Sequence, residues 1–148
     1  MSPNSQFFAI VERAPGRVDV TLRGQWSDAD AQAYEEAMIQ AVASKTRVRV
    51  LINLSELVSC TLSVRQVLSG VQRKLGESNC RTAYVANRPR LRSIALWVVH
   101  MAEDGEARSV PTQNQAEDWL LGETDRVTSI RQSTESRLAN LRRLRGAK

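Results

Sequence analysis

Residues 48–75, VRVLINLSELVSCTLSVRQVLSGVQRKL, contain two successive patterns that decide the fold. The first seven residues, 48–54, are rich in β-branched side chains and almost continuously apolar, which is typical of a central strand covered on both faces. Between Val64 and Gly76 apolar side chains recur at helical spacing, and the glycine is expected to end that helix. The polar segment 55–61 predicts a turn between them. A buried strand that leads through a short turn into an amphipathic helix is a building unit of α/β folds.

The residues before this stretch predict a β-hairpin and a first helix. Apolar runs at 7–11 and 18–22 flank Ala14-Pro15-Gly16, where proline fixes φ and glycine permits a positive φ, so a tight turn is expected. Ser27 with Asp30 three residues later has the pattern of a helix N-terminal cap. The side chains expected on the buried stripe of this helix are Tyr34, Ala37, Met38, Ala41 and Val42.

The residues after the deciding stretch predict two more strands, each followed by a helix. Residues 80–86 form a short apolar run, and Pro89 suits the first turn of a helix because its missing N–H would be unpaired there in any case. Residues 106–110 have the length of an edge strand, and Thr112 starts a last short helix that ends at Gly122. The predicted order is ββαβαβαβα, an α/β fold with a single mixed β-sheet and right-handed parallel crossovers.

The chain divides by composition into a predicted α/β domain at 1–122 and a basic C-terminal tail at 123–148. The tail carries seven basic and three acidic side chains, with Leu138, Leu141 and Leu144 spaced among the arginines as in an amphipathic helix. Three interpretations stay open: a solvated extension, a helix that docks on an acidic partner or a second protomer, and contact with nucleic acid or an anionic membrane. Binding through so few charges would be salt-sensitive, so nucleic acid is not the expected partner.

The overall composition is that of a folded chain without membrane spans. The 148 residues carry a formal net charge of +5, and 42% of them are hydrophobic while 25% are charged. No stretch of twelve residues lacks a charged side chain, whereas a membrane-spanning helix needs about 20 predominantly apolar residues. Residues 1–10 lack the basic and apolar segments of a secretory signal, so a cytoplasmic location is expected.

The same composition argues against most catalytic chemistry. His100 is the single histidine, no glycine-rich phosphate loop is present, and Cys60 and Cys80 do not form a metal-ligand or redox motif. The two cysteines are interpreted as buried thiols, and Trp26 and Trp119, together with a third tryptophan at position 97, as packing residues. We therefore expect neither a cofactor nor a metal, and not an enzyme, because no convergent set of reactive groups can be assembled.

The order of elements, together with LINLSELVSCTLSVRQVLSGVQRKL at 51–75, resembles the STAS domains, in particular the SpoIIAA-like group of anti-sigma-factor antagonists. The similarity covers most of 18–121 and lies in the pattern of elements: a hairpin, a helix, a hydrophobic strand, a loop, and a helix that begins near Ser63. The resemblance implies a bacterial regulatory domain that binds another protein.

The resemblance also implies a role for Ser63. In phosphorylated members of the family, the loop before this helix carries an Asp-Ser-Ser-Gly type sequence whose serine is modified by a partner kinase, and Ser63 matches that serine by position. Thr61, Leu62 and Val64 stand at the other three positions of the motif. The alternative is that Ser63, with Gln66 three residues later, caps the helix.

Two function hypotheses follow. The first is a non-enzymatic protein-interaction module that binds a regulatory partner, a kinase or an anti-sigma-like factor, through residues 59–74; a homodimer is left open. The alternative is a binding protein for a small, lipid-like apolar ligand held beneath the apolar helix at 91–101. On the docking surface, Gln72 and Lys74 are expected to be exposed beside the candidate site residues. These candidates are Ser59, Thr61, Ser63, Arg65, Gln66 and Arg73.

Overall fold

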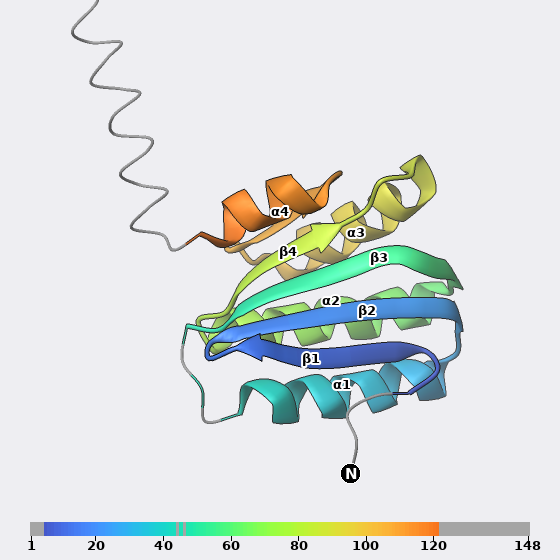
Figure 1. Ribbon diagram of the computed structural model, residues 1–148. Coiled ribbons are helices and arrows are strands. Elements are labelled where there is room, and N and C mark those ends of the chain that lie inside the picture. Colours follow the sequence, from blue (N-terminus) through green and yellow to red (C-terminus); the bar gives the residue numbers. More distant parts are fainter. Residues whose placement is uncertain (1–4, 44, 46, 122–148) are drawn as a thin grey trace, which may run out of the picture.

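The computed structural model describes residues 5–43, 45 and 47–121, and Figure 1 shows how their helices and strands are arranged. The predicted order of strands and helices is confirmed, and the basic tail predicted at 123–148 lies outside the described residues. The elements are β1 (Phe8–Ala14), β2 (Arg17–Trp26), α1 (Asp28–Val42), β3 (Arg49–Cys60), α2 (Leu62–Glu77), β4 (Arg81–Val85), α3 (Pro89–Ala102), β5 (Ala107–Val110) and α4 (Gln113–Leu120).

The five strands form one mixed sheet in the order β1-β2-β3-β4-β5. The hairpin strands β1 and β2 are antiparallel, and each later strand is parallel to its neighbour. Consecutive residues of β3 face opposite ways: Ile52 joins the main core with α1, α2 and α3, whereas Leu51 packs with Trp119 and Leu120 of α4. Three helices therefore cover one face of the sheet and α4 covers part of the other, which confirms the predicted α/β class (Figure 1).

The main core is held by the alternating strand residues and by the apolar stripes of three helices. Phe8, Trp26 and Tyr34 form an aromatic cluster in which the ring centroids lie 5.3 to 6.0 Å apart. All three side chains are at most 4% exposed. Complete burial raises the pKa of the Tyr34 hydroxyl well above its ordinary value. The N-terminal hairpin and α1 are thus fixed to each other by close aromatic packing.

The polar turn predicted at 55–61 is wrong, because β3 continues as a strand to Cys60. The ten-residue strand β2 supplies the reason. It pairs with β3 along its whole length, from Arg17 opposite Arg49 to Trp26 opposite Cys60, with two register shifts on the way. Leu57, at 4% exposure, keeps this second half of β3 anchored in the core. A partner strand and a buried leucine outweigh the turn propensity of the local sequence.

Two predictions about α2 are corrected by its contacts. The helix passes through Gly76 and ends at Glu77. A side chain at Gly76 would place its Cβ only 2.7 Å from Oδ2 of Asp104, so the glycine permits a close approach between α2 and the loop after α3. Gln72, expected on the exposed face, is fully buried.

Gln72 is buried because three other side chains satisfy its amide. Its Nε2 donates to Oγ1 of Thr82 at 3.1 Å and to Oδ2 of Asp104 at 2.9 Å. The Tyr84 hydroxyl donates to Gln72 Oε1 at 2.7 Å. Such a network is stable in a core only when its members are hydrogen-bonded, so it fixes the position of α2 against β4.

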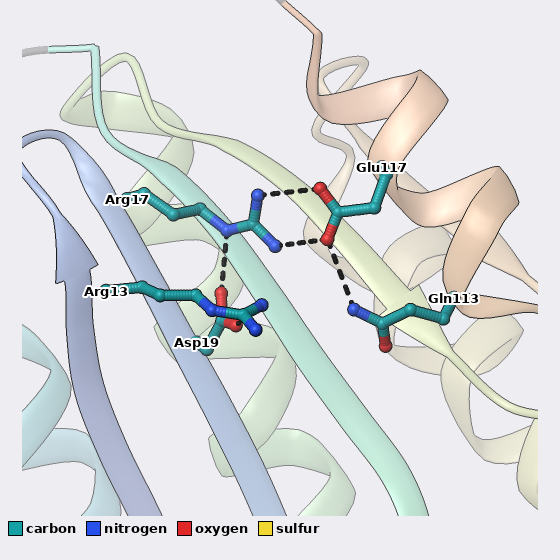
Figure 2. A network of polar contacts seen from close by, with 5 residues as sticks. All are labelled: Arg13, Arg17, Asp19, Gln113 and Glu117. Atoms are coloured by element: carbon teal, nitrogen blue, oxygen red, sulfur yellow. Dashed lines mark hydrogen bonds and ion pairs between the residues drawn. The ribbon is translucent and has the colours of Figure 1, made fainter.

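A second polar network lies on the α4 side of the sheet, at the end where β2 begins (Figure 2). Arg17 donates two hydrogen bonds to the carboxylate of Glu117 on α4, at 2.6 and 2.9 Å, and one to Asp19 at 2.6 Å. Arg13 donates to the other oxygen of Asp19 at 3.0 Å. On the same face, Arg81 forms an ion pair with Glu106 and stacks on the ring of Trp119. We call Arg13, Arg17 and Arg81 the paired arginines.

Candidate docking surface at the start of α2

The start of α2 is capped by Thr61, one residue before the helix begins. The Thr61 hydroxyl accepts a hydrogen bond from the backbone N–H of Val64 at 3.3 Å. The prediction that Ser63 caps the helix with Gln66 is therefore wrong. Ser63 is the second residue of α2, and its hydroxyl donates to Oδ1 of Asp28 in the first turn of α1, at 2.6 Å. Ser63 thus links the starts of two neighbouring helices.

A surface groove of about 410 Å³ runs between α1 and α2 beside this link. Its lining includes both polar and apolar surface and carries the carboxylates of Asp28 and Glu35 on the α1 side. Lys74, further along α2, approaches Glu35 at 3.5 Å. The lining residues are Asp28, Gln32, Glu35, Ser63, Gln66, Val67 and Gly70.

Two apolar side chains are exposed on either side of the connection from β3 to α2. Val58 is 56% exposed near the end of β3, and Leu62 is 59% exposed at the first position of α2. Single exposed apolar residues are common on proteins. Here the pair flanks Ser59 and Thr61, so the short connection is bordered by apolar surface on both sides. We call residues 56–66 the junction.

Beyond Asn53, β3 has one strand neighbour within the part of the chain that the structure describes. The pairing of β3 with β4 ends at Asn53 opposite Val85, whereas its pairing with β2 continues to Cys60. The β4 side of the overhang receives one side chain, since Nη2 of Arg88 donates to the carbonyl oxygen of Ser55 at 2.9 Å. The second half of β3 therefore forms a local sheet edge.

Positive charge surrounds this edge. Burial raises the pKa of the Cys60 thiol, and a hydrogen bond from Arg65 and the charges of Arg65 and Arg90 oppose that rise. Arg65 is half-buried, and its Nε has no hydrogen-bond partner in the described part of the chain. We call Arg65, Arg88 and Arg90 the junction arginines. Within residues 5–43, 45 and 47–121, none of the three lies within ion-pair distance of a carboxylate.

The structure brings most of the predicted site residues together. Ser59, Thr61, Ser63 and Arg65 lie within the junction, and exposed Gln66 lines the groove. Their role as a docking site stays a prediction.

Arg73 is the exception among the predicted site residues. It lies two turns further along α2, and its Nη2 donates to the carbonyl oxygen of Met101 at 2.9 Å. It therefore holds α2 against the last turn of α3.

The sequence patterns did not reveal Val58 and Leu62 as surface residues of the junction, or Arg88 and Arg90 as residues beside it. Leu62 had a visible signal, because it precedes the apolar stripe of α2 and does not share its spacing. The basic run around Pro89 was also visible, since residues 88–92 read RPRLR. Neither signal shows that these side chains lie beside the end of β3, because that position depends on the relative lengths of β3 and β4.

The structure also locates the residues weighed for catalysis. His100 is exposed in the last turn of α3. Cys80 is buried, which raises the pKa of its thiol to about 11. Cys60 is half-buried, so the interpretation of both cysteines as buried thiols holds for Cys80 alone. Over the described ranges, no group of three or more His, Cys, Asp or Glu side chains could hold a metal ion.

The structure also tests the predictions made for the three tryptophans and for the apolar side of α3. Trp26 and Trp119 are buried, whereas Trp97 is half-buried against the main core. The apolar side of α3, expected to cover a ligand cavity, packs into the main core through Leu91, Ile94, Ala95 and Val98. In the part of the chain that the structure describes, no helix is long and apolar enough to cross a membrane.

Comparison with solved structures confirms the fold. An uncharacterised DUF3478-family protein from Shewanella loihica PV-4, described as having a SpoIIAA-like fold, superposes with a TM-score of 0.60 at 21% identity; the match covers 82% of this chain and 99% of that one. The anti-sigma factor antagonist SpoIIAA in its unphosphorylated form superposes with a TM-score of 0.56 at 18% identity; the match covers 75% of this chain and 94% of that one.

A third structure agrees with the first two. An anti-sigma factor antagonist from Mycobacterium paratuberculosis gives a TM-score of 0.53 at 22% identity, over 76% of this chain and 93% of that one. Neither a protein-family model nor a curated protein matches the sequence. The resemblance stated from sequence is thus confirmed at the level of a SpoIIAA-like, STAS-like fold.

Proposed function

We propose that this chain is a non-enzymatic regulatory module that binds a protein partner through the junction and the exposed face of α2. The observation that carries the proposal is the exposure of Val58 and Leu62, each more than half, on both sides of a connection that is otherwise polar. The partner class is a cytoplasmic regulatory protein, an anti-sigma-like factor or its kinase. This class is favoured because two of the structures with the same fold are anti-sigma factor antagonists.

The exposed side chains of Val58 and Leu62 contribute little to the stability of the isolated domain. Leu62 gains little by folding, because most of its surface remains in water. Burial of apolar surface is worth about 25 cal/mol per Å², so a partner that covers Val58 and Leu62 gains free energy that the isolated domain does not have. The neighbouring groove offers hydrogen-bonding groups at its rim, including Gln66 and Ser63.

Ser63 supplies a means of regulation within the same proposal. Its hydroxyl is exposed and donates to the Asp28 carboxylate. A phosphoryl group there would add about −1.5 to −2 charges beside that carboxylate and opposite Glu35 across the groove. The resulting repulsion would separate the starts of α1 and α2 and change the surface that the partner contacts.

The proposal is tested by affinity capture with chemical crosslinking in extracts of the native host, using Leu62→Asp and a matched control, Val11→Asp. Val11 is also apolar and 51% exposed, but it lies on β1. We expect the wild type and Val11→Asp to capture the same partner, and Leu62→Asp to capture about tenfold less, because a charge would then be buried in the interface. Equal capture by all three proteins would show that the junction is not the docking surface.

A further inference from the structure

Among the described residues, the second half of β3 has no neighbouring strand on the side where β4 pairs with its first half. β4 ends at Val85, so the β4 side of residues 56–60 faces no strand among the described residues. The backbone N–H and C=O groups along a strand edge form hydrogen bonds with an added strand readily. Ser55 already accepts from Arg88, so the open edge begins at Glu56 and ends at Cys60.

The side chains along this edge include an exposed apolar residue, Val58, and an acidic residue, Glu56, that pairs with an arginine of β2. Val58 is more than half exposed, while its neighbour Leu57 is buried and fixes the strand to the core. Glu56 is the one acidic residue of the edge, and it approaches Arg23 of β2 at 3.6 Å. Its charge is therefore offset on the β2 side and does not neutralise the arginines on the β4 side.

The positive charge beside residues 56–60 favours an acidic partner segment. Arg88 and Arg90 come from the start of α3, and Arg65 from the first turns of α2, so positive side chains reach the edge from two elements. Neither helix has an acidic residue in its first turn. The positive ends of both helix dipoles add to the arginine charges at this edge. An anionic partner gains from this field, whereas a basic one is repelled.

We propose that the open edge of β3 binds an extended, acidic segment of the partner as an added strand. Main-chain hydrogen bonds to residues 56–60 supply affinity, and carboxylates of the segment lie against the junction arginines. An alternating apolar side chain contacts Val58. This inference rests on the proposed function and adds to it the conformation and the charge of the partner segment.

The first experiment selects binders to the full chain from a phage-displayed library of random linear peptides. We expect the enriched peptides to alternate acidic and β-branched residues. Hydrogen exchange of the chain should slow at residues 56–60 when such a peptide binds, because the added strand occupies the edge amides. Peptides without acidic residues, slowed exchange confined to other segments, or the absence of any binder would overturn the proposal.

A second experiment tests main-chain pairing with one enriched peptide, resynthesised in two forms that are N-methylated at alternate residues. Because alternate N–H groups of an added strand face the sheet, one form should lose about tenfold or more in affinity while the other keeps it. Equal losses in both forms, or none, would contradict strand addition.

Charge recognition is tested with Arg88→Glu/Arg90→Glu and with Arg90→Glu alone, which leaves the bond from Arg88 to Ser55 intact. The control is Arg49→Glu, an exposed residue at the opposite end of β3. We expect about tenfold weaker peptide binding for both junction variants and no change for the control. A single-stranded oligonucleotide that binds more tightly than the acidic peptides would identify the arginines as a nucleic-acid contact and overturn the proposal.

The two proposals fail in different ways. If Leu62→Asp loses the natural partner while the junction variants keep it, the partner uses the start of α2 without adding a strand to β3. If acidic peptides bind the edge but Leu62→Asp keeps the natural partner, the edge is a separate site and the docking surface of the proposed function is wrong.

Discussion

Two groups of arginines in this molecule have the same charge and opposite surroundings. The paired arginines lie on the α4 side of the sheet, where each contacts a carboxylate. Figure 2 shows Arg13 and Arg17 with Asp19 and Glu117. Arg81 pairs with Glu106. The junction arginines lie at the other end of the parallel strands, and over the described ranges no carboxylate pairs with them. The paired arginines thus form ion pairs within the fold, whereas the junction arginines are available to contact a partner.

The difference also explains why the net charge of the chain is a poor guide to its partners. The paired arginines add to the charge count, but their fields are largely cancelled within a few ångströms by the carboxylates. Arg90 contributes the same formal charge, yet it stands in the first turn of α3, where the helix dipole is also positive. The local field, and not the total of +5, indicates the surface that attracts an acidic segment.

The largest effect on stability is expected when Arg81, one of the paired arginines, is replaced. Arg81 is 8% exposed, its Nε donates to the Trp119 carbonyl at 2.5 Å, and its guanidinium lies 3.7 Å from the Trp119 ring centroid. Arg81→Met removes this hydrogen bond and the contact of the guanidinium with the Trp119 ring, so the free energy of unfolding should fall by about 2 kcal/mol in urea denaturation.

The matched control is Arg90→Met, which removes an exposed arginine that forms no ion pair with any other described residue. We expect it to change the free energy of unfolding by less than about 0.5 kcal/mol. If the two variants lost equal stability, the division between paired and junction arginines would not reflect their contribution to the fold.

The second prediction adds negative charge beside the junction. Ser63→Asp places a carboxylate where the hydroxyl now donates to Asp28, so both the hydrogen bond and the charge balance are lost. We expect a loss of about 1 kcal/mol in the free energy of unfolding, as for other like charges in contact.

The control is the same substitution in an Asp28→Asn background. There the new carboxylate faces a neutral amide and the N-terminal end of the α2 dipole, so Ser63→Asp should cost little or become stabilising. An identical loss in both backgrounds would show that Asp28 does not oppose negative charge at position 63.

Local patterns were sufficient for much of the fold. The capping box of α1 needs two residues that lie three positions apart, Ser27 and Asp30, and the structure shows both of its hydrogen bonds. Pro89 opens α3 as predicted. The apolar stripes of the helices also pack where their spacing indicates, because burial of one face follows directly from the helical period.

The parts that local patterns missed depend on residues far apart in the sequence. Gln72 is a polar residue in a helix, and its burial becomes favourable only through Thr82, Tyr84 and Asp104. The overhang of β3 depends on the difference between the lengths of β2 and β4. The site residues near 59–66 are neighbours in the sequence, so they could be proposed from it. The approach of the α3 arginines to the end of β3 could not, because it depends on how β2, β3 and β4 pair.

The third prediction separates stability from binding at the junction. Arg90→Glu replaces a positive charge by a negative one in the first turn of α3, where the helix dipole favours an anion. The free energy of unfolding should therefore rise by about 0.5 kcal/mol. Binding of acidic peptides should weaken in the same variant, so that urea denaturation and fluorescence polarisation move in opposite directions. A fall in both would mean that Arg90 stabilises the fold.

The smallest expected effect is a pH dependence in the paired group. Hydrogen bonds from Arg17 hold the pKa of Glu117 below its ordinary value. The folded state thus binds the proton less readily than the unfolded state, so the stabilisation by this carboxylate is complete above the unfolded pKa and is lost as the pH falls through the folded one.

Comparison with Glu117→Gln isolates this contribution. Because the Glu117 side chain is 41% exposed, solvent screens the ion pair, and the difference in the free energy of unfolding should be about 0.5 kcal/mol near neutral pH. It should decline to zero between about pH 5 and pH 3, as the wild-type carboxylate becomes protonated. A matched series with Arg90→Gln should show no such decline, since no carboxylate pairs with Arg90 in the described part of the chain. A pH-dependent difference there would place an unrecognised carboxylate at the junction and remove the contrast between the two arginine groups.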